Sequence, residues 1–205
     1  MPVSQRPIRI AVLVSGGGSN LEAILQSCER GELPGISVDL VISSRPGVLA
    51  IERARKRGIE TVVVDPKAFA SDAEFQAAIL KHLKASQIDL VCLAGYLRKL
   101  GVNLIQAYRG RILNIHPALL PKFGGAGMYG HFVHEAVLKA GEKESGCTVH
   151  LVDEEFDQGP ILAQARVPVK AGDTPEQLAA RVLEQEHRLY PSTIKQFCEK
   201  LRGTL

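Results

Sequence analysis

Short apolar runs alternate along this chain with longer stretches in which apolar residues recur every three or four positions. The runs predict buried strands, and the stretches between them predict amphipathic helices. The predicted strands cover residues 8–14, 38–43, 61–65, 89–94, 112–115, 148–153 and 161–169. The predicted helices cover residues 19–30, 47–57, 72–86, 101–108, 131–140 and 175–199, and the spacing in the last of them allows a break near Pro191.

The order of these elements predicts an α/β fold. Each of the first four apolar runs is followed by a helical stretch, which favours a Rossmann-like, mainly parallel sheet flanked by helices. The last two runs lie close together around Gly159-Pro160 and predict a hairpin at the sheet edge. A length of 205 residues suits a single domain with a sizeable core, and 45% hydrophobic residues without tryptophan predict that this core is mainly aliphatic.

Composition excludes several classes of function. The formal net charge is +3, and its Lys and Arg residues are scattered, so we expect no nucleic-acid interface. The four cysteines are far apart without a CxxC pair, which argues against a disulfide framework or zinc ribbon. No apolar stretch approaches the roughly 18 residues of a membrane span, and residues 1–7 show no targeting signal. We therefore expect a cytoplasmic protein without membrane association.

A glycine-rich loop follows the first predicted strand and leads into a helix. Its glycines allow close backbone approach to a ligand, and the helix start favours an anion, so we predict a phosphate on Gly18, Ser19 and Asn20. Leu21 stands where a dinucleotide fingerprint has its third glycine, and no Walker lysine follows. The structural alternative is that the glycines only tighten the turn while Ser19 or Asn20 caps the helix.

Asn114 and His116 stand two residues apart where an apolar strand ends in proline. Side chains with this spacing project to the same face of a strand. The amide can donate to a developing oxyanion while the imidazole moves a proton, which suits acyl transfer without a covalent intermediate. The alternative is a strand end that holds two polar residues without a catalytic role.

Asp157 follows a predicted strand in an acidic loop that ends in Gln-Gly-Pro. It is either a turn former or a carboxylate that raises the pKa of His116 toward working pH. His131 and His134 stand three apart at a predicted helix start, but no third ligand with clear spacing accompanies them. We therefore expect no metal site, and we assign the two histidines to the helix start.

Several motifs in fixed order carry a resemblance to a known family. They are Ser-Gly-Gly-Gly-Ser-Asn at 15–20, Leu-Ala-Gly-Tyr-Leu-Arg at 93–98, Asn-Ile-His-Pro-Ala-Leu-Leu-Pro at 114–121, Gly-Cys-Thr-Val-His-Leu-Val-Asp at 146–153 and Asp-Gln-Gly-Pro-Ile at 157–161. With these motifs the chain resembles the phosphoribosylglycinamide formyltransferases from about residue 8 to about residue 197. The segment 185–191 also resembles the C-terminal helix of that family.

The resemblance implies a formyltransferase fold and a reaction of purine biosynthesis. The formyl group of the co-substrate 10-formyltetrahydrofolate would pass to the amine of glycinamide ribonucleotide. Asn114, His116 and Asp157 match the family's catalytic triad. Asn114 and protonated His116 would stabilise the oxyanion, and Asp157 would keep His116 charged and position a relay water. We expect a monomer or a homodimer.

Binding roles follow from the same resemblance. Gly18, Ser19 and Asn20 match the substrate phosphate loop, and Glu186 matches a residue that contacts the ribose or the glycinamide end. The segment of Leu97, Arg98, Lys99 and Leu100 matches the folate-contacting segment, and Asn114 would touch both ligands. We expect one formyltransferase domain over residues 1–205, with a nucleotide-binding half at about 1–110 and a folate-binding and catalytic half at about 111–205.

Two departures from the family pattern bear on the site. The loop from Gly124 to Gly130 is longer and richer in glycine than in many relatives, which suggests a mobile lid beside the site. Asp72 stands where some relatives have a basic residue that faces the folate glutamate tail. Three alternatives remain open: a formyltransferase for another amine, a hydrolase that gives the formyl group to water, and a non-catalytic nucleotide- or folate-binding protein. A tRNA acceptor is disfavoured, since relatives of that kind carry an extra domain.

Overall fold

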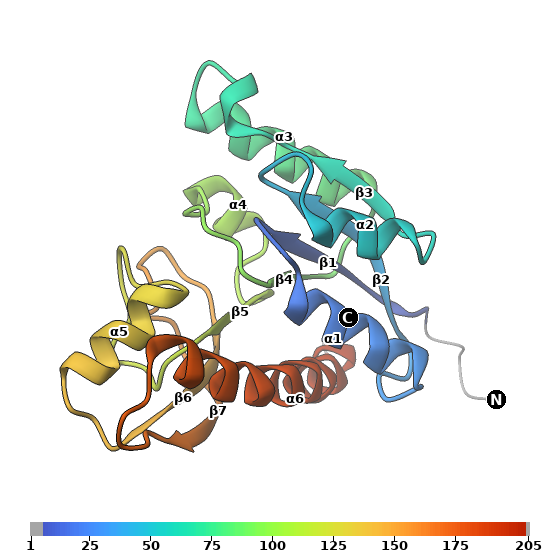
Figure 1. Cartoon of the computed structure of the whole chain (residues 1–205). Helices are drawn as coiled ribbons and strands as arrows, with labels where there is room; N and C mark the ends of the chain where they lie inside the picture. The colour runs from blue at the N-terminus through green and yellow to red at the C-terminus, as the bar shows by residue number, and fades with distance from the viewer. Residues whose placement is uncertain (1–5, 204–205) are drawn as a thin grey trace.

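A twisted seven-stranded sheet forms the centre of the protein (Figure 1), in a computed structural model that describes residues 6–203. The strands are β1 (Ile8–Val14), β2 (Ile36–Ser43), β3 (Glu60–Val63), β4 (Leu90–Leu93), β5 (Ile112–His116), β6 (Glu144–Leu151) and β7 (Ile161–Pro168). They lie in the order β3-β2-β1-β4-β5-β6-β7. Pairing is parallel from β3 to β5 and antiparallel from β5 to β7. The predicted fold class and the edge hairpin are confirmed.

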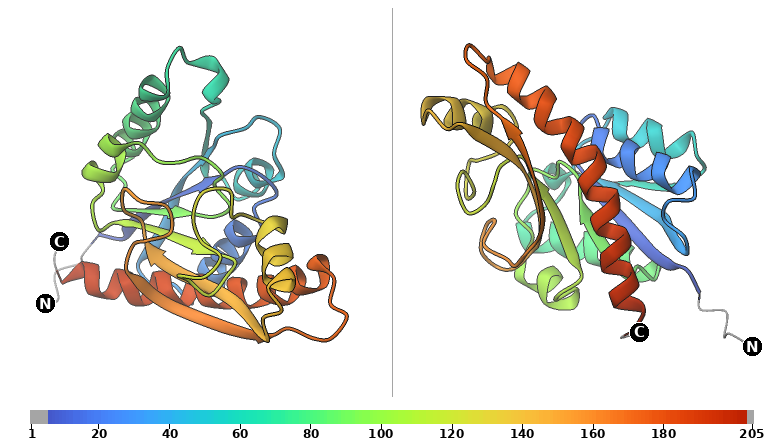
Figure 2. Two further views of the ribbon diagram at one scale, coloured as in Figure 1. Left: turned by 90° about the vertical axis from the view of Figure 1, so that its left-hand side faces the viewer. Right: turned by 90° about the horizontal axis from the view of Figure 1, so that it is seen from below.

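Helices cover both faces of the sheet. They are α1 (Ser19–Glu29), α2 (Leu49–Arg55), α3 (Asp72–Ala85), α4 (Val102–Ala107), α5 (His131–Lys139) and α6 (Pro175–Arg202), with a short 3-10 turn, η1 (Pro66–Ala68). Buried residues of α1, α2, α5 and α6 join one hydrophobic cluster, and those of α3 and α4 join another on the opposite face. Figure 2 shows α6 lying along the same side of the sheet as α1.

Strand composition reflects position in the sheet. The strand β4 is buried along its whole length because helices cover both faces of the parallel region, whereas β7 at the sheet edge is exposed or half-buried except at Val167. The strand β6 begins at Glu144, before the predicted start at residue 148. Ser145 and Gly146 continue the pairing with β7 without adding apolar residues, so periodicity gave no signal there.

The break that the sequence allowed near Pro191 does not occur, because α6 runs without interruption from Pro175 to Arg202. Proline removes one backbone donor from a helix, but tertiary packing holds the segment together here. Tyr190 and Ile194 are fully buried on either side of the proline. The Tyr190 hydroxyl lies 3.0 Å from the carbonyl oxygens of Leu93 and Leu113, which ties α6 to the ends of β4 and β5.

Some sequence predictions concern the chain ends or the environment. Residues 1–5 and 204–205 of the predicted domain and N-terminal stretch lie outside the described range. Within residues 6–203, none of the helices combines the length and apolar character needed to pass through a bilayer. All four cysteines are described, and each is a free thiol.

Candidate active site

A cleft of about 640 Å³ opens at the carboxyl ends of the parallel strands. The chain leaves β1 toward one face of the sheet and β4 toward the other, so the loops after these adjacent strands diverge there, as at the ligand sites of open α/β sheets. The two loops contact each other where the Leu97 N–H donates to Ser15 Oγ at 3.0 Å. Segments from both ends of the chain line the cleft, including α6 and the loops after β5 and β6.

The glycine-rich loop forms one end of this cleft. Gly18 is the N-cap of α1 with a φ of 71°, a left-handed conformation that favours glycine. The cap has no side-chain hydrogen bond, so the alternative in which Ser19 or Asn20 caps the helix is wrong. Ser19 and Asn20 line the cleft, and the first-turn N–H groups of α1 remain free of intrahelical bonds. This end of the cleft therefore suits an anion.

Asn20 and Glu186, which are distant in sequence, lie in contact beside this loop. Asn20 Nδ2 donates to Glu186 Oε2 at 2.6 Å, and both residues are buried. Burial raises the pKa of Glu186, and the bond from Asn20 partly offsets that effect. Asn20 Oδ1 is buried without a hydrogen-bond partner among the described residues, so the pair retains unused polar capacity toward the cleft.

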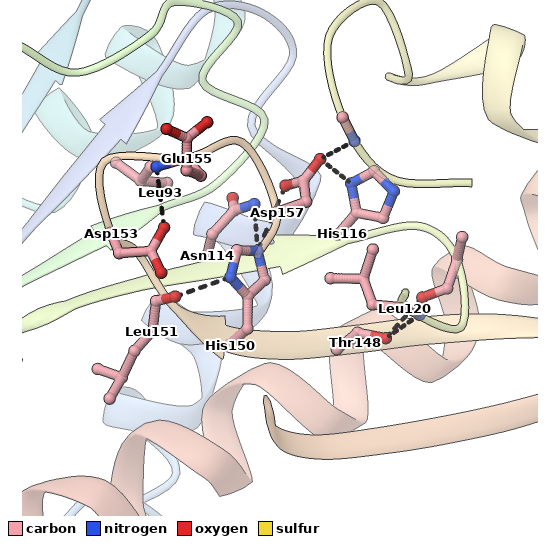
Figure 3. A network of polar contacts seen from close by, with 12 residues as sticks. Leu93, Asn114, His116, Leu120, Thr148, His150, Leu151, Asp153, Glu155 and Asp157 are labelled. Carbon is pink, nitrogen blue, oxygen red and sulfur yellow. Dashed lines mark hydrogen bonds and ion pairs between the residues drawn. The ribbon is translucent and has the colours of Figure 1, made fainter. Parts of the chain in front are cut away.

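Asn114, His116 and Asp157 converge at the centre of the cleft (Figure 3). The first two stand on β5, and Asp157 reaches them from the loop after β6. His116 Nδ1 lies 3.6 Å from Asp157 Oδ2, and its Nε2 lies 2.8 Å from the Phe123 carbonyl oxygen. A carbonyl only accepts, so Nε2 carries a proton and Nδ1 is the nitrogen that can exchange one.

His150 is a member of this cluster that sequence reasoning missed. It stands directly opposite Asn114 in the antiparallel register of β5 and β6, and it is buried. Its Nε2 lies 3.1 Å from Asn114 Nδ2 and 3.4 Å from Asp157 Oδ1, while its Nδ1 donates to the Leu151 carbonyl. The two-residue alternation of side chains along β6 could have placed His150 on one face of the sheet. Only the pairing of β6 with β5 shows that this is the face of Asn114.

Electrostatics at the centre differ from the sequence prediction. Burial lowers the pKa of His116 below its usual value, and this effect outweighs the opposing contributions of Asp157 and the Phe123 carbonyl. The expectation that Asp157 raises this pKa was therefore right in the sign of its own effect and wrong in the net result. Burial alone would raise the pKa of Asp157, but contacts with His150, His116 and the Gly125 N–H lower it. Asp157 is thus a carboxylate facing a mainly neutral imidazole at neutral pH.

Two backbone conformations around His116 are unusual. Phe123 has a φ of 57° and Asp157 a φ of 54°, in the left-handed region that bulky residues rarely adopt. Both residues hold His116, through the Phe123 carbonyl and the Asp157 carboxylate. Asp157 Oδ2 also accepts from the Gly125 N–H at 2.9 Å. Strain of this kind persists only where surrounding contacts over-determine the conformation, and it clusters at functional sites.

The predicted folate-contacting segment also lines the cleft. Leu97 is exposed, Leu100 is buried, and both line the cleft together with Arg98 and Lys99. Lys99 Nζ lies 5.1 Å from the centre of the Phe156 ring, so the lysine and the loop before Asp157 flank one wall.

Asp72 contacts this segment from α3. Its Oδ1 lies 3.6 Å from Arg98 Nη2, and both side chains are exposed. The carboxylate therefore pairs with a cation of the cleft wall.

The glycine-rich segment after β5 and the start of α5 also line the cleft. His131 begins α5 and bonds Glu135 Oε1 through Nε2 at 2.7 Å, as expected for a residue at the helix start. His134 is buried and lines the cleft. No group of three or more His, Cys, Asp or Glu residues arranged to hold a metal ion occurs within residues 6–203.

Comparison with known proteins gives a consistent result. Residues 8–194 match the family model described as formyl transferase. The chain is 45% identical over 194 residues to the trifunctional purine biosynthetic protein adenosine-3 of Drosophila melanogaster, and 48% identical over 194 residues to the chloroplastic phosphoribosylglycinamide formyltransferase of Arabidopsis thaliana. Each match covers 94% of this chain, but only 14% and 66% of those longer proteins. The crystal structure of glycinamide ribonucleotide transformylase 1 from Symbiobacterium toebii superimposes with a TM-score of 0.91 at 45% identity, covering 98% of this chain and 92% of the other.

Proposed function

The chain belongs to the formyl transferase family, and on that basis we propose that it transfers the formyl group of 10-formyltetrahydrofolate to the amine of glycinamide ribonucleotide in purine biosynthesis. One observation carries this proposal. The same cleft holds an amide, an imidazole and a carboxylate at its centre and an anion-binding helix start at one end. A phosphorylated amine bound at that end has its reactive group directed toward His116.

Two halves of the chain share the ligands in this proposal. The nucleotide-binding half, at about residues 1–110, supplies Gly18, Ser19 and Asn20 for the phosphate, and Glu186 of the other half binds the ribose or glycinamide end. The segment Leu97–Leu100 and Asn114 contact the folate. The contact between Asn20 and Glu186 supports a single acceptor site built from both halves.

The chemical step needs charge stabilisation and one proton transfer. The acceptor amine attacks the formyl carbon, a carbon–nitrogen bond forms, and negative charge develops on the formyl oxygen, where the Asn114 amide and the imidazolium of His116 stabilise it. The imidazolium gives its Nδ1 proton to the folate nitrogen as the bond to the formyl carbon breaks, and the proton that the attacking amine loses then restores the charge of His116. Asp157 stabilises the charged imidazole from 3.6 Å, and the Phe123 carbonyl fixes the other ring nitrogen.

Absorbance of the folate product tests the proposal directly. Turnover of 10-formyltetrahydrofolate is followed with glycinamide ribonucleotide, with no acceptor, and with the His116→Ala variant. We expect turnover only with the ribonucleotide and a large loss in the variant. Release of the formyl group without an acceptor would assign a hydrolase instead. Inactivity of the wild type in both mixtures would refute the transfer of the formyl group to glycinamide ribonucleotide.

A further inference from the structure

His134 is a buried imidazole that the mechanism above does not use. It stands on α5, and only 4% of its surface is exposed. Neither ring nitrogen has a hydrogen-bond partner among the described residues, and Nδ1 is sealed from solvent. Buried polar groups in native proteins nearly always have partners. A group outside the chain is therefore needed to satisfy this side chain.

The position of His134 indicates where that group lies. The residue lines the same cleft as His116 and Glu186, on the wall formed by α5 and α6. Ala179 and Ala180 of α6 also line the cleft, and their side chains are small. The helix α5 packs against α6, which carries Glu186, so His134 belongs to the acceptor side of the cleft.

The protonation state of His134 limits the chemistry of its partner. Burial lowers its pKa to about 4, with smaller contributions from His131 and His116, so the ring is neutral at neutral pH. A neutral imidazole carries one N–H and one lone pair. An unpaired buried N–H is rarer in proteins than an unpaired acceptor, so the sealed Nδ1 keeps the lone pair and Nε2 carries the proton. The group that His134 can bind from the cleft is then a hydrogen-bond acceptor.

We propose that His134 is a specificity-determining residue that donates a hydrogen bond from Nε2 to an uncharged oxygen of the formyl acceptor. This oxygen is either the amide carbonyl or a ribose hydroxyl of the bound ribonucleotide. The inference rests on the proposed function for the identity of the acceptor. It adds a polar contact on the α5 wall to those from the phosphate loop and Glu186.

The test compares His134→Phe with His134→Gln. Phenylalanine fills the space without a donor, whereas the glutamine amide reaches the position of Nε2 and can donate. We expect His134→Phe to raise the KM for the acceptor about 3- to 10-fold, as for loss of one hydrogen bond, with the KM for the folate unchanged. His134→Gln should restore most of the loss. Thermal unfolding controls for folding, and we expect His134→Phe to be no less stable than wild type at neutral pH, since it removes an unpaired polar group.

Modified acceptors distinguish the two oxygens. A 2′- or 3′-deoxy acceptor should weaken binding to the wild type but not further weaken binding to His134→Phe if the partner is that hydroxyl. If each deoxy acceptor weakens binding to His134→Phe as much as to the wild type, neither hydroxyl is the partner, and the amide carbonyl is assigned. An unchanged acceptor KM in His134→Phe, or an equal rise in both KM values, would overturn the proposal.

Equilibrium titration separates this inference from the proposed function. Calorimetric binding of glycinamide ribonucleotide without folate needs no turnover. Binding without formyl transfer would refute the proposed reaction while still allowing the His134 comparison. Failure of the wild type to bind this ribonucleotide would refute both, whereas tight binding that His134→Phe leaves unchanged would refute only the role of His134.

Discussion

Replacement of Asp157 by asparagine tests the electrostatic account of His116 most directly. The variant removes one negative charge 3.6 Å from His116 Nδ1, and an asparagine oxygen can still accept from the Gly125 N–H. At an effective dielectric constant of about 20, two unit charges at this distance interact by roughly 4 to 5 kcal/mol before solvation losses. An opposite charge at such a distance typically shifts a pKa by about 1 to 3 units. We expect the pKa of His116, already lowered by burial, to fall by about that amount.

The consequence for the rate has a definite sign. His116 must hold a proton at Nδ1 to stabilise the oxyanion, and well above its pKa the charged fraction falls about tenfold per unit. Asp157→Asn should therefore reduce kcat at neutral pH by about 10- to 1,000-fold, with the falling limb of the rate profile shifted to lower pH. The charged form exists below the pKa of His116, so the deficit should shrink as the pH decreases.

Two measurements check this prediction. The pH dependence of kcat reports the working protonation state, and an NMR titration of the His116 ring reports its pKa independently. Asp153→Asn is the matched control, because Asp153 also lines the cleft but its carboxylate accepts from the Glu155 N–H at 3.0 Å. A His116 pKa in Asp157→Asn equal to that of wild type would refute the reasoning.

Three further predictions concern stability and the phosphate loop. Tyr190→Phe should cost about 1 to 3 kcal/mol in chemical denaturation, because buried carbonyls of β4 and β5 lose their donor; unchanged stability would contradict that role. Gly18→Ala should raise the acceptor KM and lower the free energy of unfolding by about 1 to 3 kcal/mol, since the φ of Gly18 is positive and the added Cβ would lie 2.6 Å from the Ala50 Cβ. Gly17→Ala is the control, because its added Cβ meets nothing within 4 Å. Equal effects of the two substitutions would contradict the steric argument. The pKa of His134 is about 6.5 in the unfolded chain and about 4 in the folded chain, so protonation of the unfolded chain lowers the free energy of unfolding by about 3 kcal/mol as the pH drops from above 6.5 to 4. The free energy of unfolding of His134→Phe, measured against pH, should lack this decrease. Identical pH profiles of the variant and the wild type would refute the prediction.

Local sequence information was sufficient for most of the fold. Strand and helix periods depend on neighbouring residues, so apolar spacing identified the seven strands and six helices near their observed positions. The helix continues through Pro191 for a physical reason: buried contacts of Tyr190 and Ile194 outweigh the lost backbone bond. Roles of the site residues remain proposals, although the structure brings the predicted catalytic groups into one cleft.

The sequence by itself determined the α/β order, the glycine loop at a helix start and the pairing of Asn114 with His116 on one strand face, because each is set within a few residues. Tertiary structure alone decided that Asn20 meets Glu186 and that His150 joins Asn114 and Asp157. It also decided the charge of His116, since a pKa depends on how deeply distant segments bury the ring. Burial around that imidazole outweighs the carboxylate beside it.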